Sequence, residues 1–146
     1  MKQLTIFYDA HCGLCTKFRY WLLQQRACVP LVFLPYDAPA AEKQLPTIDT
    51  LNPDKEIIVL ADDGRWWQGP PAWLTCLWTL KKYRPWAKRL AHPTLLPVVE
   101  KLCHLLAENR FTISELLHLK PDQLAHTLKA QTPKCTTSAC TRPKSF

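Results

Sequence analysis

The sequence predicts an α/β domain built on a four-stranded mixed sheet, with flanking helices and a C-terminal helical extension. Three observations support this fold class. A strand, an amphipathic helix and a second apolar strand follow one another near the N-terminus. Two more strands, joined by a tight turn, occupy the middle of the chain and lead into another helix. Beyond that helix, apolar residues recur only at helical spacing, which indicates helices that pack over the sheet.

The first 35 residues predict a βαβ unit. Residues 2–8 alternate loosely and end in apolar and aromatic side chains, which favours a strand. Between residues 13 and 26 the apolar side chains recur every three to four positions, so we expect an amphipathic helix with one buried stripe. Residues 31–35 form a short apolar run that suits a buried parallel strand.

The middle of the chain predicts an antiparallel pair followed by a helix. A loop with a short helix near residues 39–44 precedes it. Residues 56–61 are the clearest strand in the chain, and we expect this strand to be buried on both faces. A turn at residues 62–64 leads to a strand over residues 65–68. Gly69 and two prolines then start a helix that runs to about residue 83, since proline is tolerated in a first turn.

The order βαβ then ββα is the minimal thioredoxin-like arrangement. Helices predicted over residues 94–109, 113–118 and 121–129 form the extension that covers the sheet. We expect residues 1–130 to form a single domain, because 146 residues bury a sizeable core without disulfides. Residues 131–146, rich in Thr, Ser, Pro and Lys, predict a flexible basic tail.

The net charge of +7 comes from the second half of the chain. Residues 1–64 carry six Lys or Arg against eight Asp or Glu, whereas residues 65–146 carry thirteen against four. A nucleic-acid or membrane-surface partner is one interpretation. A solvated basic face is favoured, because no nucleic-acid-binding motif accompanies the charge, and we expect no nucleic-acid partner. The longest apolar stretch, residues 95–106, is interrupted by proline and charges, so we expect no transmembrane segment and a soluble protein.

The seven cysteines are odd in number and scattered. That pattern does not suit a secreted disulfide scaffold, and the chain begins with a predicted strand in place of a signal peptide. We therefore expect a reducing, cytoplasmic environment. Three of the cysteines, Cys28, Cys76 and Cys103, occupy positions typical of small core residues.

The most informative stretch is Tyr-Asp-Ala-His-Cys-Gly-Leu-Cys at residues 8–15, where the first strand meets the first helix. Cys12 is expected at the exposed helix end, where unpaired N–H groups favour the thiolate and lower its pKa. Cys15, one turn further in, is expected to remain a protonated resolving thiol. A lowered pKa helps Cys12 mainly as a leaving group, because nucleophilicity falls together with basicity.

Two neighbours of the cysteines are candidate site residues. Asp9 lies three residues before Cys12, where it either caps the helix or accepts the proton of the Cys15 thiol. His11, if protonated, lowers the pKa of Cys12, although an exposed loop histidine without a catalytic role is the favoured interpretation.

Two interpretations of the cysteine pair involve no redox chemistry. One is a pair of small buried residues, and the other is half of a zinc site. A zinc site needs two more ligands, which Cys135 and Cys140 would have to supply from the tail at a loose spacing. Redox chemistry is favoured, and we expect no metal and no cofactor. Among the tryptophans, Trp66 and Trp67 must face opposite sides of their strand, so one of them is expected to be exposed.

Residues 8–15 resemble the motif of the DCC family of thiol-disulfide oxidoreductases, a Tyr-Asp pair followed after two residues by Cys-x-x-Cys. Asp63-Gly64 with Gly69 and Ala72 looks like the family's turn-strand-Gly-helix segment, and residues 107–110 look like its Asn-Arg helix ending. The likeness covers about residues 3–115. It implies a thioredoxin-like fold, dithiol chemistry, and a disulfide-containing protein or small thiol as substrate, with an electron donor that the motif does not specify.

Two features depart from thioredoxin-like enzymes. These enzymes place a cis-proline before the third strand, and the nearest candidate here is Pro53, at an unusual spacing. The residues between the two cysteines, Gly13 and Leu14, include no proline. The sequence therefore predicts a thiol-disulfide oxidoreductase in which neither feature supports the usual pairing of an extended substrate with the backbone of a cis-proline. The alternative is a non-catalytic thioredoxin-like module that binds a partner or senses redox state through a basic face.

Overall fold

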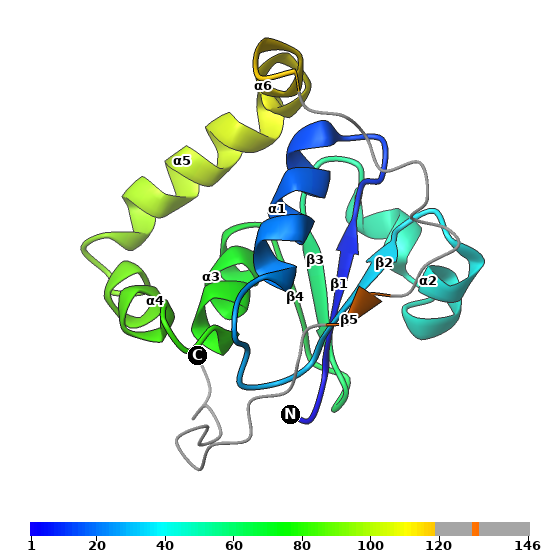
Figure 1. Cartoon of the computed structure of the whole chain (residues 1–146), viewed down its shortest axis with the longest axis horizontal. Coiled ribbons are helices and arrows are strands. Elements are labelled where there is room, and N and C mark those ends of the chain that lie inside the picture. The colour runs from blue at the N-terminus through cyan, green and yellow to red at the C-terminus, as the bar shows by residue number, and fades with distance from the viewer. Residues whose placement is uncertain (119–129, 132–146) are drawn as a thin grey trace.

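The computed structural model describes residues 1–118 and 130–131, and it contains a mixed sheet with helices on both faces (Figure 1). The strand order is β4-β3-β1-β2-β5. The central strand, β1 (Leu4–Tyr8), runs parallel to β2 (Leu31–Pro35) and antiparallel to β3 (Ile58–Ala61), which pairs antiparallel with β4 (Trp66–Gln68). The predicted four-stranded mixed sheet is therefore confirmed. The sheet also gains β5 (Ala130–Gln131), a two-residue strand antiparallel to β2 that the sequence did not predict.

The two faces of the sheet bury separate apolar clusters. Successive side chains of a strand point to opposite faces, so Ile6 and Tyr8 of β1 pack towards α1 (Gly13–Leu23) and α3 (Pro70–Thr79). Phe7 packs on the other face, beneath α2 (Pro39–Gln44) and the short 3₁₀ helix Ile48–Leu51. The interior position of β3 is also confirmed, because β1 and β4 flank it and only Leu60 of its residues is partly exposed.

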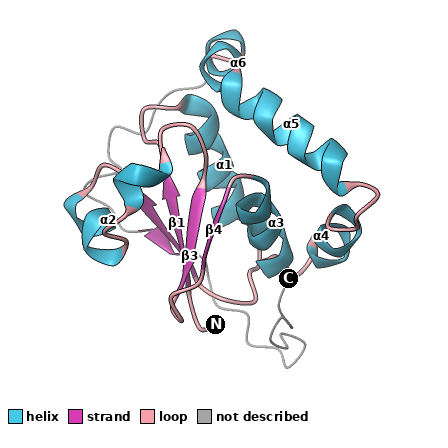
Figure 2. Cartoon of the chain, turned by 180° about the vertical axis from the view of Figure 1, so that it is seen from behind, coloured by secondary structure: helices cyan, strands magenta, loops and turns pink. Residues whose placement is uncertain are grey.

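Three more helices extend the fold: α4 (Arg84–Leu90), α5 (Leu96–Glu108) and α6 (Arg110–Leu116). Figure 2 shows α5 running across the side of the molecule that carries α1 and α3, with α6 near the start of α1. No residue of α5 itself is fully buried. The predicted helical cover is thus present, and its longest helix, α5, contributes no fully buried side chain to a core.

Most predicted elements are present, with ends shifted by one to a few residues. The helix expected to reach about residue 83 stops at Thr79, because Leu80 is extended and bridges to Ala27. Two elements were not predicted from the sequence: α4, which has a proline in its first turn, and the 3₁₀ helix. The predicted helix 121–129 and nearly all of the predicted tail lie outside the described residues, so the domain boundary remains a prediction.

In the described part of the chain, no helix has both the length and the apolar character needed to cross a bilayer. Of the paired tryptophans, Trp66 is the exposed one, at 45%. Cys76 is buried as predicted, whereas Cys28 and Cys103 are both partly exposed, so their assignment as core residues is wrong.

Candidate active site

The two cysteines lie at the junction between β1 and α1, as the sequence predicts. Cys12 is the N-cap of α1, and its carbonyl accepts hydrogen bonds from both the N–H and the hydroxyl of Thr16, each at 3.0 Å. The Cys12 sulfur accepts the backbone N–H of Cys15 at 3.3 Å. A side chain in this position satisfies one of the unpaired N–H groups at the helix start, and here a sulfur takes the place that an oxygen usually fills.

The surroundings make Cys12 the acidic member of the pair. A hydrogen bond from the Cys15 thiol lowers the pKa of Cys12 to about 6, and the Cys15 N–H and the Arg110 charge act in the same direction. Burial and the charge of Asp9 oppose this shift. The same sulfur–sulfur hydrogen bond, together with burial and the Cys12 charge, raises the pKa of Cys15 far above its usual range. The predicted order of acidity is therefore present, and its main cause is the partner thiol.

The expected exposure of the two sulfurs is wrong. Cys12 is 0% exposed, whereas Cys15 is only half-buried. The reason is the capping geometry: the Cys12 side chain turns back over the first turn of α1 to accept the Cys15 N–H, so it does not project from the helix end.

Asp9 does not cap α1, so that expectation is wrong as well. One carboxylate oxygen of Asp9 accepts the N–H of His11 at 2.9 Å. The other accepts a hydrogen bond from Arg110 at 3.1 Å, and both side chains of this ion pair are nearly buried. The His11 side chain is 73% exposed and approaches Asp37 at 3.5 Å, which agrees with its interpretation as a loop residue.

The contribution of α6 to the site was not predicted from the sequence. Arg110 is its first residue and brings a positive charge to the dithiol from about a hundred positions along the chain. Ser114, one turn later, accepts the N–H of Leu14 at 2.9 Å and so caps a second free donor at the start of α1. The sequence signal for this contribution was the Asn109-Arg110 pair. The Asn109 side chain donates to the Leu105 carbonyl at the end of α5, and α6 begins at Arg110.

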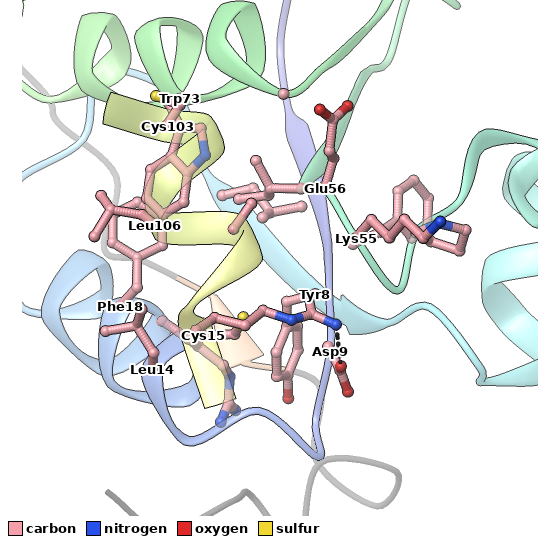
Figure 3. Close-up of a pocket in the computed structure, with 18 of the residues that line it drawn as sticks. Tyr8, Asp9, Leu14, Cys15, Phe18, Lys55, Glu56, Trp73, Cys103 and Leu106 are labelled. Atoms are coloured by element: carbon pink, nitrogen blue, oxygen red, sulfur yellow. Dashed lines mark hydrogen bonds and ion pairs between the residues drawn. The ribbon is translucent and has the colours of Figure 1, made fainter. Parts of the chain in front are cut away.

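A largely apolar pocket of about 410 Å³ opens beside the dithiol. Its walls come from β1, α1, the first turn of α3, α5 and the loop before β3. Cys15 lines this pocket next to the Asp9–Arg110 pair, with Phe18, Trp73 and Leu106 close by (Figure 3). Cys103 also lines it, whereas Cys12 does not. The pocket therefore reaches the dithiol through Cys15.

The far side of the pocket carries Glu56. Its carboxylate lies by Gly69, the N-cap of α3, and an added Cβ on that glycine would be 3.1 Å from a carboxylate oxygen. Gly69 also has a φ of +61°, so the position suits glycine on both counts. Glu56 approaches His104 of α5 at 3.7 Å, which links the two walls.

Pro53 is buried and lines the same pocket. Among residues 1–118 and 130–131 there is no cis peptide bond. Within the same residues, no group of three or more His, Cys, Asp or Glu side chains is placed to hold a metal ion. Cys135 and Cys140, the other ligands of the zinc alternative, lie outside the described part of the chain.

A protein-family model matches most of the chain. The family model described as DCC1-like thiol-disulfide oxidoreductase matches residues 6–116, about three quarters of the chain. No curated protein and no solved structure matches the chain. The matched span includes the cysteine pair, the pocket, and the Arg110 and Ser114 side chains that α6 contributes.

Proposed function

We propose a function that starts from the family: the chain belongs to the DCC1-like thiol-disulfide oxidoreductases, and Cys12 and Cys15 are its redox pair. The observation that carries the proposal is the shared proton of the pair. Cys12 has a pKa of about 6, so it is mostly thiolate at neutral pH, while Cys15 holds its proton and donates it to the Cys12 sulfur. This is the division of roles that dithiol exchange needs.

In the proposed cycle, the Cys12 thiolate attacks one sulfur of a substrate disulfide and expels the other sulfur as a thiolate. Cys12 then carries no charge and no longer accepts the Cys15 thiol. In the resting protein, the charge on Cys12 and its hydrogen bond with Cys15 both raise the pKa of Cys15. That pKa therefore falls once the mixed disulfide forms. Cys15 then loses its proton and attacks the Cys12 sulfur, which releases the second substrate thiol. Two electrons pass to the substrate, and a Cys12–Cys15 disulfide remains.

Asp9 is the proposed acceptor of the proton that Cys15 loses. Its charge acts on both thiols, and Arg110 holds the carboxylate in place. We further propose a disulfide-containing protein or a small thiol as substrate, and a reducing compartment such as the cytoplasm, as the scattered cysteines suggest.

Insulin reduction in the presence of a thiol donor tests this function. We expect the wild-type protein to accelerate the reaction and Cys12→Ser to abolish it. Cys15→Ser should accumulate a mixed disulfide on Cys12, which mass spectrometry detects, since nothing remains to resolve it. Cys28→Ser is the matched control, because Cys28 is a partly exposed cysteine outside the motif, and it should retain full activity. Equal activity of wild type and Cys12→Ser would contradict the proposal.

The burial of Cys12 favours a second candidate, a non-catalytic thioredoxin-like module that senses redox state or binds a partner through its basic face. A sulfur without exposed surface suits a slow, stoichiometric reaction better than rapid turnover. The two candidates differ in the same assay. A sensor forms the Cys12–Cys15 disulfide reversibly with an oxidant but shows no turnover with insulin.

A further inference from the structure

The pocket offers a second way to reach the redox pair. If Cys12 passes electrons to a substrate, the disulfide that remains must be reduced before the next cycle. Cys12 is 0% exposed, while Cys15 lines the pocket of about 410 Å³. A reductant that occupies this pocket therefore meets the sulfur of Cys15 first.

The apolar surface and the charged side chains of the pocket indicate the chemical character of such a reductant. Aromatic rings of Phe18, Trp21 and Trp73 supply much of the apolar wall, and the volume lies in the range of small-molecule sites, roughly 300–1,000 Å³. Two exposed lysines, Lys17 and Lys55, are also among the lining residues. The lining residues carry four cationic side chains, those of Lys17, Arg19, Lys55 and Arg110, against the two carboxylates of Asp9, which pairs with Arg110, and Glu56. An apolar body with an anionic end fits this distribution.

Resting on the proposed function, we propose that the electron donor is a small apolar dithiol with a carboxylate, bound in this pocket and reacting at Cys15. A donor thiolate attacks the Cys15 sulfur and breaks the Cys12–Cys15 bond. Cys12 departs as a thiolate, for which its low pKa makes it a good leaving group. The second donor thiol then attacks the donor sulfur of the mixed disulfide and releases Cys15, which takes a proton. The donor ends as a cyclic disulfide, and two electrons and one proton have moved to the protein; the other donor proton goes to solvent, because Cys12 remains a thiolate at neutral pH.

A dithiol suits this site better than two separate thiols. A second monothiol would have to enter a pocket that the first one already occupies, whereas a second thiol on the same molecule acts at high effective concentration. The reaction thus uses both cysteines in the roles that their positions allow: Cys15 accepts the attack, and Cys12 leaves.

The test measures how fast different donors reduce the oxidised protein, followed by tryptophan fluorescence and by mass after alkylation. Dihydrolipoate has the proposed chemistry, dihydrolipoamide lacks its charge, and dithiothreitol is a hydrophilic dithiol. We expect dihydrolipoate to react at least about tenfold faster than dithiothreitol. Dihydrolipoamide should be about two- to fivefold slower than dihydrolipoate at low salt, the size of an exposed ion pair.

Two variants of α5 localise the effect. Ala107 lines the pocket and Leu105, two residues earlier, is 57% exposed and does not, so Ala107→Phe fills the pocket while Leu105→Phe is its matched control. Neither change disturbs a buried position, because no residue of α5 is fully buried. Ala107→Phe should slow dihydrolipoate about tenfold or more, and Leu105→Phe should stay within about twofold of wild type. In wild-type protein, octanoate should inhibit dihydrolipoate competitively.

The outcomes separate this inference from the function on which it rests. Equal rates for dihydrolipoate and dithiothreitol would overturn the inference and leave dithiol exchange intact. Absence of octanoate inhibition, or faster reduction by a reduced partner protein than by any small dithiol, would also overturn it. Failure of the protein to form a Cys12–Cys15 disulfide that any of these thiols reduces would instead contradict the proposed function.

Discussion

Replacing Arg110 with methionine removes the positive charge that α6 brings to the dithiol. The Arg110–Asp9 pair joins two side chains that are 10% and 5% exposed, at 3.1 Å. The Arg110 charge lowers the pKa of Cys12, and the Asp9 charge raises it. In Arg110→Met, the Asp9 charge acts alone, so the pKa of Cys12 should rise by about one unit, from about 6.

That shift has measurable consequences. The thiolate fraction of Cys12 at pH 7 should fall from about 90% to about 50%. Because the thiolate stabilises the reduced protein, the loss of about 1 kcal/mol should lower the reduction potential of the pair by about 20 mV. The assay is the ultraviolet absorbance of the thiolate against pH, supplemented by equilibration with a glutathione buffer.

The variant also leaves a buried carboxylate unpaired, which costs about 3–5 kcal/mol and is a large part of the stability of a domain of this size. The double variant Asp9→Asn with Arg110→Met is the control for this loss of stability. It removes the two opposing charges together, so it should be more stable than the single variant and should keep the pKa of Cys12 closer to that of the wild type. If Arg110→Met folds and its Cys12 still titrates at about 6, the electrostatic role assigned to Arg110 is refuted.

Further predictions concern stability, proton transfer and the tail. Since the pKa of Cys12 falls from about 9 in the unfolded chain to about 6 in the folded one, its ionisation stabilises the reduced protein fully above the unfolded value, and this contribution is lost as the pH falls through 6. Urea unfolding should therefore show stability rising between pH 6 and 8, by at most about 1.4 kcal/mol per unit, and oxidised protein should lack this rise. Asp9→Asn should slow the resolution of the mixed disulfide in stopped-flow experiments while Cys12 remains reactive, and unchanged resolution would exclude Asp9 as the proton acceptor. Ser114→Ala should cost about 1 kcal/mol in urea unfolding, because the N–H of Leu14 loses its acceptor. Gly69→Ala should cost more than about 1 kcal/mol, given its φ of +61° and the nearby Glu56 carboxylate. Truncation after Ala130 should leave insulin reduction unchanged if Cys135 and Cys140 are dispensable, and loss of turnover in a folded truncated protein would place the tail in the mechanism.

The sheet and its first helix were predictable because their signals are local. β2 and α2 have the predicted bounds, since an apolar run between breakers and a proline-initiated helix depend on neighbouring residues alone. By contrast, α4 was not predicted; its Pro85 lies in the first turn of the helix, where a proline breaks no hydrogen bond. β5 depends on a distant edge of the sheet, for which two residues of sequence carry no signal.

The site was predictable in its residues and not in its contacts. The spacing of Cys12 and Cys15 after a strand indicated both the helix N-terminus and the order of acidity. The exposure of the two thiols was wrong because the sulfur of Cys12 itself serves as the cap. The role of Asp9 as a cap was wrong because its partner, Arg110, lies far away in the sequence. Long-range pairs of this kind need tertiary structure, although the resemblance at Asn109-Arg110 had marked their location.

A redox titration followed by peptide mapping tests the central claim most directly. The protein is equilibrated across a series of glutathione ratios, free thiols are alkylated, and the disulfides are located by mass spectrometry. We predict one two-electron transition in which Cys12 and Cys15 become linked to each other, while Cys28, Cys76 and Cys103 remain alkylatable after unfolding. If Cys12 and Cys15 stay free throughout the series, or either of them pairs with a different cysteine instead, the assignment of the redox centre is contradicted.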